Sequence, residues 1–229
     1  MQTIIVLTGA GISAESGIRT FRDSNGLWEE YRIEDVATFE AWQKNPKLVL
    51  EFYNQRRRQL STVQPNAAHH ALVRLEQKFN VQIITQNVDN LHERAGSKNI
   101  LHLHGELTKA RSTVNHDLIT DIGYNDINPG DKCANGSQLR PHIVWFGEEV
   151  PNIGIASEMT SEADIIIVIG TSLNVYPAAG LLHYAPAHTV KYLIDPNAKG
   201  DFYTRNLTIV AEKAGIAVPA LVDKLLEKT

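Results

Sequence analysis

The chain has 229 residues, enough for one large α/β unit with a smaller inserted domain and too few for a third independent domain. A formal net charge of -4 with 43% apolar residues argues against a nucleic-acid-binding surface and against disorder, and favours a small molecule or a peptide as partner. One cysteine, Cys133, leaves no intrachain disulfide, and the longest apolar run, residues 165–169, is too short to span a bilayer. No basic leader precedes the first predicted strand, so we expect a cytoplasmic protein without a membrane partner.

Short runs rich in isoleucine and valine recur along the chain and predict strands buried on both faces of a parallel sheet. These runs are residues 4–7, 81–85, 100–103, 143–146, 165–169, 192–194 and 207–210. Apolar residues at helical spacing predict helices at 68–78 and 218–226, as the connections of a parallel sheet require. We therefore predict an α/β fold built on a Rossmann-like, doubly wound parallel sheet.

Two segments do not fit this sheet, and we interpret them as one small domain inserted twice. Residues 27–60 have a helical pattern without a strand, and residues 106–141 are polar and show little periodicity. The predicted boundaries place residues 1–27, 68–105 and 142–229 in the Rossmann-like domain, and residues 28–67 and 106–141 in the small domain.

A glycine loop follows the first predicted strand. Residues 9–14, GAGISA, match the dinucleotide-binding fingerprint G-x-G-x-x-G/A. Gly9 permits a tight turn, Gly11 lets backbone amides approach a pyrophosphate, and Ala14 keeps the following helix close to the sheet. The pattern is weak by itself, and a glycine-containing turn without a ligand remains the alternative.

The segment after this loop argues against a dehydrogenase. A hydride-transferring enzyme needs a second strand that ends in Asp or Glu about 20 residues after the glycines. Here Glu29, Glu30 and Glu34 lie instead in a helical stretch that bears aromatic residues. A simple hydride transfer is therefore disfavoured.

Polar residues follow other predicted strands at the edge where ligands bind in an open α/β sheet. Residues 85–92, TQNVDNLH, supply amides and one carboxylate, and residues 170–172, GTS, form a second candidate backbone cradle. Strand alternation puts His102 and His104 on one face. His104 closes its strand next to Gly105, which allows a ligand to approach closely, whereas His102 lies deeper and fits a hydrogen-bonded support residue.

Six motifs, taken together and in this order, resemble those of the sirtuins. They are GAGIS at 9–13, GIRTFR at 17–22, TQNVD at 85–89, HGE at 104–106, VWFGE at 144–148 and GTS at 170–172. The match covers nearly the whole chain, which is most similar to the bacterial class related to desuccinylating sirtuins. Several motifs in the correct order are far more specific than one glycine loop.

The resemblance implies an NAD-dependent protein-lysine deacylase that consumes NAD as a co-substrate. The acyl oxygen of the substrate lysine would attack the ribose C1′ and give an alkylamidate. His104, neutral at about pH 7, would then act as general base on the ribose hydroxyls. The products would be nicotinamide, free lysine and O-acyl-ADP-ribose, and the partners would be acylated lysine side chains of proteins or peptides.

By the same similarity, the expected catalytic residues are His104, Asn87 and Asp89. Asn87 and Asp89 would position the ribose and the carboxamide of nicotinamide, and Phe21 would shield the reacting face after nicotinamide leaves. The expected NAD-binding residues are Gly9, Ala10, Gly11, Ser13, Ala14, Arg19, Thr20, Phe21, Arg22, Trp28, Gln86, Asn87, Val88, Asp89, Gly170, Thr171, Ser172, Asp195 and Ala214. A peptide would add as a strand between two loops. These loops contain Val144, Phe146, Gly147 and Glu148 on one side, and Asn174, Val175 and Tyr176 on the other.

The acyl preference has its own signal on a helix predicted at residues 46–60. Tyr53 and Arg56 are three residues apart, so a phenol and a guanidinium can point to the same place and bind a carboxylate. The alternative is that Tyr53 is a core residue and that residues 56–58, RRR, form a solvated basic face. The Tyr-x-x-Arg pair occurs at the matching place in desuccinylating and demalonylating sirtuins, which favours removal of succinyl and malonyl groups in addition to acetyl.

Many sirtuins carry a structural zinc on two C-x2-C pairs, and this chain departs from that pattern. The residues at the corresponding spacing are Ser112, Asn115, Cys133 and Gly136, so three of the four thiolates are absent. We predict no zinc and a segment held by packing instead, without loss of activity, because the family's ion is structural. The other candidate ligands, which have no recognised spacing, are His116, Asp117 and His142.

The adenosine end departs from the family pattern as well. Where relatives often have Asn followed two residues later by Glu, this chain has Leu193 and Asp195. Asp195 can still accept a hydrogen bond from a ribose hydroxyl, but Leu193 offers only its backbone. Ala214 falls where a backbone contact to adenine is expected.

Two other functions remain as alternatives. The same NAD cleavage could deliver ADP-ribose to a protein side chain, and a non-catalytic module could bind NAD or an acyl peptide with the same loops. The pair Tyr53 and Arg56 favours deacylation over the first. The joint presence of His104, Asn87 and Asp89 disfavours the second. We expect a monomer, and the sequence does not indicate the protein targets.

Overall fold

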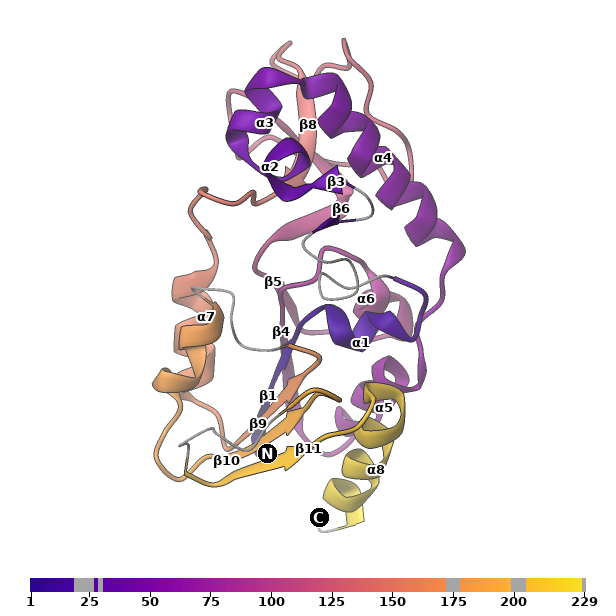
Figure 1. The fold of residues 1–229 in the computed structure, drawn as a ribbon. Coiled ribbons are helices and arrows are strands. Elements are labelled where there is room, and N and C mark those ends of the chain that lie inside the picture. Colours follow the sequence, from indigo (N-terminus) through magenta and orange to yellow (C-terminus); the bar gives the residue numbers. More distant parts are fainter. Residues whose placement is uncertain (19–26, 29–30, 172–177, 199–204, 228–229) are drawn as a thin grey trace.

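The computed structural model describes residues 1–18, 27–28, 31–171, 178–198 and 205–227, with the backbone alone at 27, 28, 178 and 179. Within these residues, a six-stranded parallel sheet has the order β11-β10-β9-β1-β4-β5 (Figure 1). Its strands are β1 (Thr3–Thr8), β4 (Asn80–Thr85), β5 (Ile100–His102), β9 (Ile165–Ile169), β10 (Val190–Ile194) and β11 (Leu207–Val210). The predicted Rossmann-like parallel sheet is confirmed.

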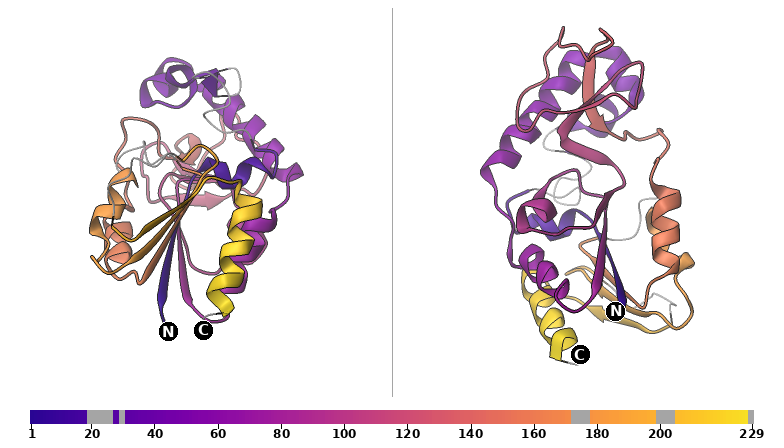
Figure 2. Two further views of the ribbon diagram at one scale, coloured as in Figure 1. Left: turned by 60° about the horizontal axis from the view of Figure 1, so that its bottom comes forward. Right: turned by 180° about the vertical axis from the view of Figure 1, so that it is seen from behind.

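Helices cover both faces of this sheet. Ile4 and Val6 of β1 pack in one core with α5 (Ala67–Leu75) and α8 (Ala214–Glu227). Ile5 and Leu7, which point the other way, pack in a second core with α7 (Ile153–Ser161). Figure 2 shows α5 and α8 together on one side of the sheet and α7 on the other. Because both faces are buried, the strands are apolar throughout rather than alternating.

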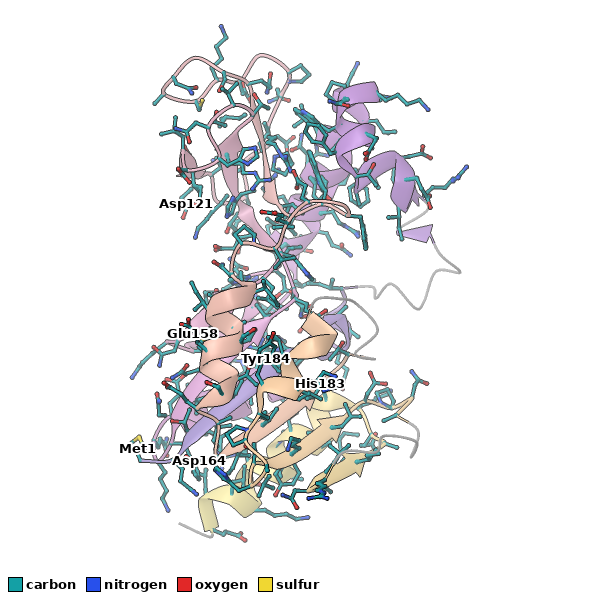
Figure 3. All side chains as sticks on the ribbon, turned by 90° about the vertical axis from the view of Figure 1, so that its left-hand side faces the viewer. Met1, Asp121, Glu158, Asp164, His183 and Tyr184 are labelled. Atoms are coloured by element: carbon teal, nitrogen blue, oxygen red, sulfur yellow. The ribbon has the colours of Figure 1, made fainter. Side chains whose placement is uncertain are left out.

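The face that α7 covers also carries a short 3-10 helix, η2 (Ala178–Tyr184). Figure 3 shows α7, labelled at Glu158, beside η2, labelled at His183 and Tyr184. At the far end of the sheet, the backbone N–H of Thr3 donates to Asp164 Oδ2 at 2.8 Å. This bond ties the start of β1 to the start of its neighbour β9.

A smaller unit lies above the carboxyl ends of the parallel strands in Figure 1. It contains α2 (Ile33–Val36), α3 (Phe39–Lys44), α4 (Pro46–Thr62) and an antiparallel sheet in the order β7-β6-β8, made of β7 (Ile119–Asp121), β6 (Gly105–Ser112) and β8 (Leu139–Ile143). Phe52 of α4, Leu107 of β6 and Ile143 of β8 share one buried core. Two segments far apart in the sequence therefore pack together here.

Two predictions about strands were wrong. Residues 143–146 were predicted as a strand of the parallel sheet, but β8 ends at Ile143 and pairs antiparallel with β6. Ile143 and Trp145 are apolar because they pack in the core of the smaller unit. Residues 27–60 were predicted to lack a strand, but they contain a ribbon of β2 (Leu27–Trp28) and β3 (Tyr31–Arg32), which is too short to leave a sequence pattern.

The predicted helix at 46–60 is α4, whose start follows the usual capping rules. Asn45 Oδ1 accepts a hydrogen bond from the backbone N–H of Leu48 at 3.1 Å, and Pro46 occupies the first turn, where its missing N–H costs nothing. Tyr53 and Arg56 face inward from this helix. No helix in the described ranges is long and apolar enough to cross a membrane.

Candidate functional site

Two glycine turns touch at the carboxyl ends of β1 and β9. The backbone N–H of Gly9 donates to Ile169 O at 3.0 Å, and that of Gly11 donates to Gly170 O at 2.9 Å. A Cβ on Gly11 would lie 2.5 Å from the Gly170 Cα, and Gly170 itself has a φ of +63°. The glycines therefore allow the two turns to meet. The amide of Gly11, expected to face a pyrophosphate, is bonded to Gly170 in this structure.

The prediction for Ala14 was wrong. Ala14, the last residue of α1 (Ala10–Ala14), is exposed. Ile12 and Ser13 are fully buried, and they are the side chains that hold this helix close to the sheet.

The polar segment after β4 lies against this glycine turn. Ser13 Oγ donates to Asp89 Oδ2 at 2.9 Å, and Asn87 Nδ2 donates to Gly9 O at 3.1 Å and to Ser13 Oγ at 3.2 Å. Asp89 also accepts from the backbone N–H of Leu91, at the start of α6 (Leu91–Ala95), at 3.1 Å. Burial raises the pKa of the Asp89 carboxyl, and the hydrogen bonds from Leu91 and Ser13 oppose that rise. Three predicted site residues thus form one connected group.

His104 is hydrogen-bonded to the polar segment that follows β4. Its Nδ1 lies 3.0 Å from the backbone carbonyl of Gln86, which can only accept, so Nδ1 carries the proton of the neutral ring. Nε2 is then the basic nitrogen. Burial lowers the pKa of His104 below the usual histidine value, and the hydrogen bond to Gln86 partly opposes this. The site therefore contains a neutral imidazole with a fixed tautomer, which suits a general base.

The strand geometry around this histidine differs from the prediction. β5 ends at His102, so His104 follows the strand rather than closing it. Gly105 was expected to make room for a ligand. It has a φ of +82° and begins β6, and a Cβ there would collide with the carbonyl of His142. The space beside Gly105 is thus used by the partner strand β8.

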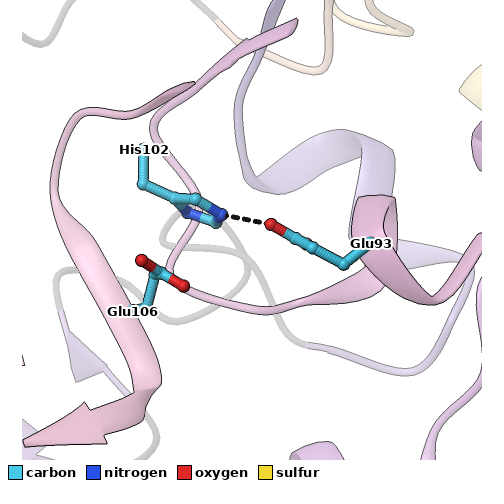
Figure 4. Close-up of side chains that lie close together, drawn as sticks. All are labelled: Glu93, His102 and Glu106. Atoms are coloured by element: carbon cyan, nitrogen blue, oxygen red, sulfur yellow. Dashed lines mark hydrogen bonds and ion pairs between the residues drawn. The ribbon is translucent and has the colours of Figure 1, made fainter. Parts of the chain in front are cut away.

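His102 is a hydrogen-bonded support residue, as predicted, although it is the last residue of β5 and does not lie deep in the strand. Its Nδ1 donates to the Asn87 carbonyl at 3.0 Å, and its Nε2 lies 2.7 Å from Glu93 Oε1 (Figure 4). Glu106 is close by and pairs with Lys109 Nζ at 2.7 Å. The possible ligand atoms of Glu93, His102 and Glu106 all lie within 4.8 Å of one another. Each of these side chains is in an ion pair, and we interpret the three as parts of a charged network.

Two of the three consecutive arginines on α4 are buried and not solvated. Tyr53 is fully buried and Arg56 is 8% exposed, with its NH2 donating to Gln59 Oε1 at 2.9 Å. Arg57 is fully buried and donates to Leu107 O, whereas Arg58 is half-exposed. The alternative of a solvated face at 56–58 therefore holds only for Arg58. An acyl group can contact Tyr53 only if neighbouring residues move when it binds.

The predicted peptide loop connects the two units through its backbone. The Val144 N–H donates to His104 O at 2.9 Å, and the Phe146 N–H donates to Ala37 O at 3.0 Å. The Phe146 side chain is 48% exposed, and Gly147 has a φ of +88°. The Glu148 carboxylate, by contrast, faces inward and accepts two bonds from Arg140, at 2.7 and 3.0 Å.

The remaining predicted residues are only partly brought together. Gln86 Nε2 donates to Thr171 Oγ1 at 3.3 Å and so joins the ends of β4 and β9, while Val88 is partly buried beside the core of the smaller unit. Asp195 follows β10 and is buried, and Ala214 opens α8. The predicted residues outside the described ranges are Arg19, Thr20, Phe21, Arg22, Ser172, Asn174, Val175 and Tyr176, and Trp28 is described by its backbone alone.

Buried hydroxyl groups lie behind the site and were not predicted as site residues. Thr8 Oγ1 donates to Thr85 Oγ1 at 2.8 Å, and Thr85 Oγ1 also accepts from the backbone N–H of Asn87 at 3.0 Å. Thr8 and Thr85 end their strands side by side. The sequence signal that could have identified them is a polar residue at the end of an apolar run. Trp145 lies inside the VWFGE motif but was not named among the site residues, and it donates from Nε1 to the Tyr53 hydroxyl at 3.1 Å.

A parallel sheet with a glycine turn and buried polar groups at its carboxyl edge is typical of nucleotide-binding α/β proteins. The model of the Sir2 family matches residues 9–177. An NAD-dependent protein deacylase of Bacteroides thetaiotaomicron is 52% identical over 99% of both chains, and one of Aggregatibacter actinomycetemcomitans is 59% identical over 86% of this chain and 95% of that one. A solved Sir2 homologue in complex with NAD superposes with a TM-score of 0.88 at 40% identity, covering 99% of this chain and 90% of the other. This chain belongs to the Sir2 family, and the resemblance to the sirtuins is confirmed.

Hydrogen bonds join the positions where zinc-binding relatives have thiolates. Ser112 Oγ accepts from the backbone N–H groups of Val114 and Asn115 and lies 2.7 Å from Ser137 Oγ. Cys133 Sγ lies 3.0 Å from the same Ser137 oxygen. One thiol beside serine and asparagine side chains does not fit a structural zinc site, which takes four thiolate or imidazole ligands.

Proposed function

We propose that this chain is an NAD-dependent protein-lysine deacylase that removes acetyl, succinyl and malonyl groups and forms nicotinamide, free lysine and O-acyl-ADP-ribose. The NAD-dependent deacylase activity follows from membership of the Sir2 family and from the names of the bacterial relatives. The acidic acyl groups are the finer part of the proposal and rest on Tyr53 and Arg56.

The catalytic proposal rests on the hydrogen bond that fixes the tautomer of the His104 ring. Its Nδ1–H is held by the Gln86 carbonyl, so Nε2 is free of a proton whenever the ring is neutral. The lowered pKa keeps the ring neutral at about pH 7. Nε2 would accept the proton of a ribose hydroxyl, and such a base accelerates reactions about 100-fold to 10,000-fold.

NAD, when bound, supplies a ribosyl carbon that becomes electrophilic as nicotinamide leaves. The connected group of Ser13, Asn87 and Asp89 would hold the nicotinamide ribose and carboxamide. These side chains are buried and already hydrogen-bonded to one another, so their orientation is set before the substrate arrives. Gly9 and Gly170 would allow the pyrophosphate to approach the backbone at the meeting point of the two turns.

Tyr53 and Arg56 would bind the carboxylate of a succinyl or malonyl group. A guanidinium and a phenol can both donate to a carboxylate, and charge-assisted bonds of this kind are about twice as strong as neutral ones. Both residues lie on α4, and Tyr53 is hydrogen-bonded to Trp145 of the peptide loop at 144–148. An acetyl group makes neither bond, so it would depend on the catalytic group alone.

The peptide would be bound mainly by backbone groups. Val144 to Gly147 form one side of the proposed strand pairing, and Asn174, Val175 and Tyr176 would form the other. Because Glu148 is engaged with Arg140, it would contribute through its backbone. The monomeric state and the cytoplasmic location stay predictions.

The test is to incubate the protein with NAD and matched acetyl-, succinyl- and malonyl-lysine peptides and to measure nicotinamide release. Arg56→Met should lower kcat/KM for the two acidic peptides by about 10-fold to 100-fold, the worth of a hydrogen bond between charged groups, and change the acetyl reaction little. Equal losses on all three peptides would reject the acidic-acyl site.

Mass spectrometry of the products separates deacylation from ADP-ribosyl transfer. Deacylation gives free lysine and O-acyl-ADP-ribose, whereas the transferase alternative adds ADP-ribose to the peptide or to the protein. His104→Ala should abolish turnover and leave NAD binding measurable by calorimetry. Unchanged turnover in this variant would reject the general-base role.

A further inference from the structure

We infer that Trp145 is a positioning residue for acyl specificity, because its indole fixes the direction in which the Tyr53 hydroxyl donates. This inference rests on the proposed acidic-acyl site. Trp145 Nε1 lies 3.1 Å from the Tyr53 hydroxyl oxygen, and both side chains are almost completely buried. Trp145 sits in the peptide loop, and 92 positions separate it from Tyr53 in the sequence.

The direction of this hydrogen bond is set by chemistry. An indole nitrogen can only donate, so the Tyr53 oxygen is the acceptor. The hydroxyl proton must then point away from the indole. Burial raises the pKa of Tyr53 well above its usual value, and the bond from Trp145 opposes this only in part. Tyr53 therefore remains a protonated donor at any pH at which the enzyme is assayed, and a carboxylate is a strong acceptor for that proton.

Trp145 is itself held in place by several neighbours. The guanidinium carbon of Arg140 lies 3.4 Å from the centroid of the Trp145 ring, and the Trp42 ring packs against it at 5.7 Å. Glu148 binds Arg140 through both carboxylate oxygens and accepts from the backbone N–H of Trp145 at 2.8 Å. A cation over an indole face is a favourable pair, and here it limits the indole to one orientation.

The surrounding charges favour an anion near Tyr53. Arg140 and Arg56 both act to lower the pKa of Tyr53, which means that they stabilise negative charge at its hydroxyl, and Glu148 opposes them. Arg111 also contacts the Glu148 carboxylate, at 3.3 Å, so two guanidinium groups share one carboxylate. Arg140 and Arg56 thus add to the preference for an acidic acyl chain.

The test compares Trp145→Phe with the wild type on matched acetyl-, succinyl- and malonyl-lysine peptides. Phenylalanine keeps an aromatic face under Arg140 but has no N–H donor. We expect kcat/KM for the acidic peptides to fall by about tenfold, mainly through KM, with a much smaller loss for the acetyl peptide. Trp42→Phe, which changes the neighbouring ring, is the matched control and should affect all three peptides alike.

A double-mutant cycle shows whether the indole acts through Tyr53. In a Tyr53→Phe background, Trp145→Phe should have no further effect on the ratio of succinyl to acetyl activity. An equal loss on all three peptides, or the same tenfold change in the Tyr53→Phe background, would overturn the inference. If Tyr53→Phe and Arg56→Met leave that ratio unchanged, the proposed acidic-acyl site itself fails. Thermal unfolding of each variant identifies losses that come from folding alone.

Discussion

The imidazole of His102 bridges Asn87 and Glu93, two residues whose interacting groups can only accept hydrogen bonds. Nδ1 faces the Asn87 carbonyl at 3.0 Å and Nε2 faces the Glu93 carboxylate at 2.7 Å. Both contacts are satisfied when both ring nitrogens carry protons, so this arrangement favours the imidazolium form. Burial acts to lower the pKa of His102, but the hydrogen bond and charge of Glu93 outweigh it and raise the pKa. The pKa of His104, two residues away, is lowered by burial, so the pKa values of the two histidines are shifted in opposite directions.

Glu93→Gln should lower the pKa of His102 and destabilise the protein in a limited pH range. The raised pKa of His102 contributes stability in full below about pH 6.5 and loses it as the pH rises through the folded value. The lowered pKa of Glu93 contributes above about pH 4.3 and loses it as the pH falls. We expect a loss of about 1 kcal/mol near pH 5 to 6, because the Glu93 side chain is 39% exposed and partly screened.

The measurement is urea unfolding across pH, together with NMR titration of the His102 ring. Glu51→Gln removes one carboxylate of the exposed pair with Arg58 and is the matched control. It should cost less than about 0.5 kcal/mol at any pH. A His102 pKa that Glu93→Gln does not lower would contradict the ion pair.

The pH dependence of catalysis should report His104. A general base works only when unprotonated, so kcat/KM should fall on the acid side as the pH drops through the His104 pKa. Because that pKa is lowered by burial, the fall should begin below the usual histidine value of about 6.5. The profile is measured with an acetyl peptide under conditions where NAD saturates. An acid limb centred above pH 7 would be inconsistent with the geometry of His104.

Ser13→Ala should weaken both folding and NAD binding. The variant removes the hydroxyl that donates to Asp89 and accepts from Asn87 Nδ2. The buried Asp89 carboxylate is left with one fewer hydrogen bond. The expected loss is about 1 to 3 kcal/mol in the free energy of unfolding, with a weaker affinity for NAD in calorimetry. Ser61→Ala, whose hydroxyl is exposed at the end of α4, should change neither quantity. Wild-type NAD affinity in Ser13→Ala would argue against the connected group as the ribose site.

Gly170→Ala should destabilise the protein far more than Gly123→Ala. Both glycines have positive φ, +63° and +55°, so both pay the backbone cost of about 1 to 2 kcal/mol for an L-residue. Only at Gly170 would the new Cβ meet backbone atoms of Gly11 and Ile12, and nothing lies within 4 Å at Gly123. We expect a total of about 3 kcal/mol or more at Gly170 by chemical denaturation. Equal losses would show that the two turns can separate without cost.

Removal of metal should leave the protein intact. Purified protein should contain no stoichiometric zinc by elemental analysis, and a chelator should change neither Tm nor activity. Ser112→Ala should lower the free energy of unfolding by about 1 to 3 kcal/mol, because Ser112 is fully buried and accepts two backbone N–H groups. Stoichiometric zinc would show that other ligands replace the missing thiolates.

Local patterns in the sequence were enough for the sheet and for the order of the motifs. Strands such as β1 and β9 are buried on both faces, so each carries a continuous apolar run that neighbouring residues alone reveal. The helical spacing of Tyr53 and Arg56 was equally local, since it depends only on α4. His102 was predicted as a support residue, but the depth in the strand on which this rested is not seen, because β5 ends at His102.

Contacts between distant segments decided the rest. Residues 143–146 are apolar like a parallel strand, but pairing with β6 and packing on α4 put them in the smaller unit. The contacts of Gly105 with β8 and the inward direction of Glu148 likewise depend on how the antiparallel sheet folds back. The bond from Trp145 to Tyr53 joins the peptide loop to α4, across 92 positions of the sequence. Hydrophobic periodicity reports how deeply a residue is buried and not which residue it meets, so only the tertiary structure could supply these pairs.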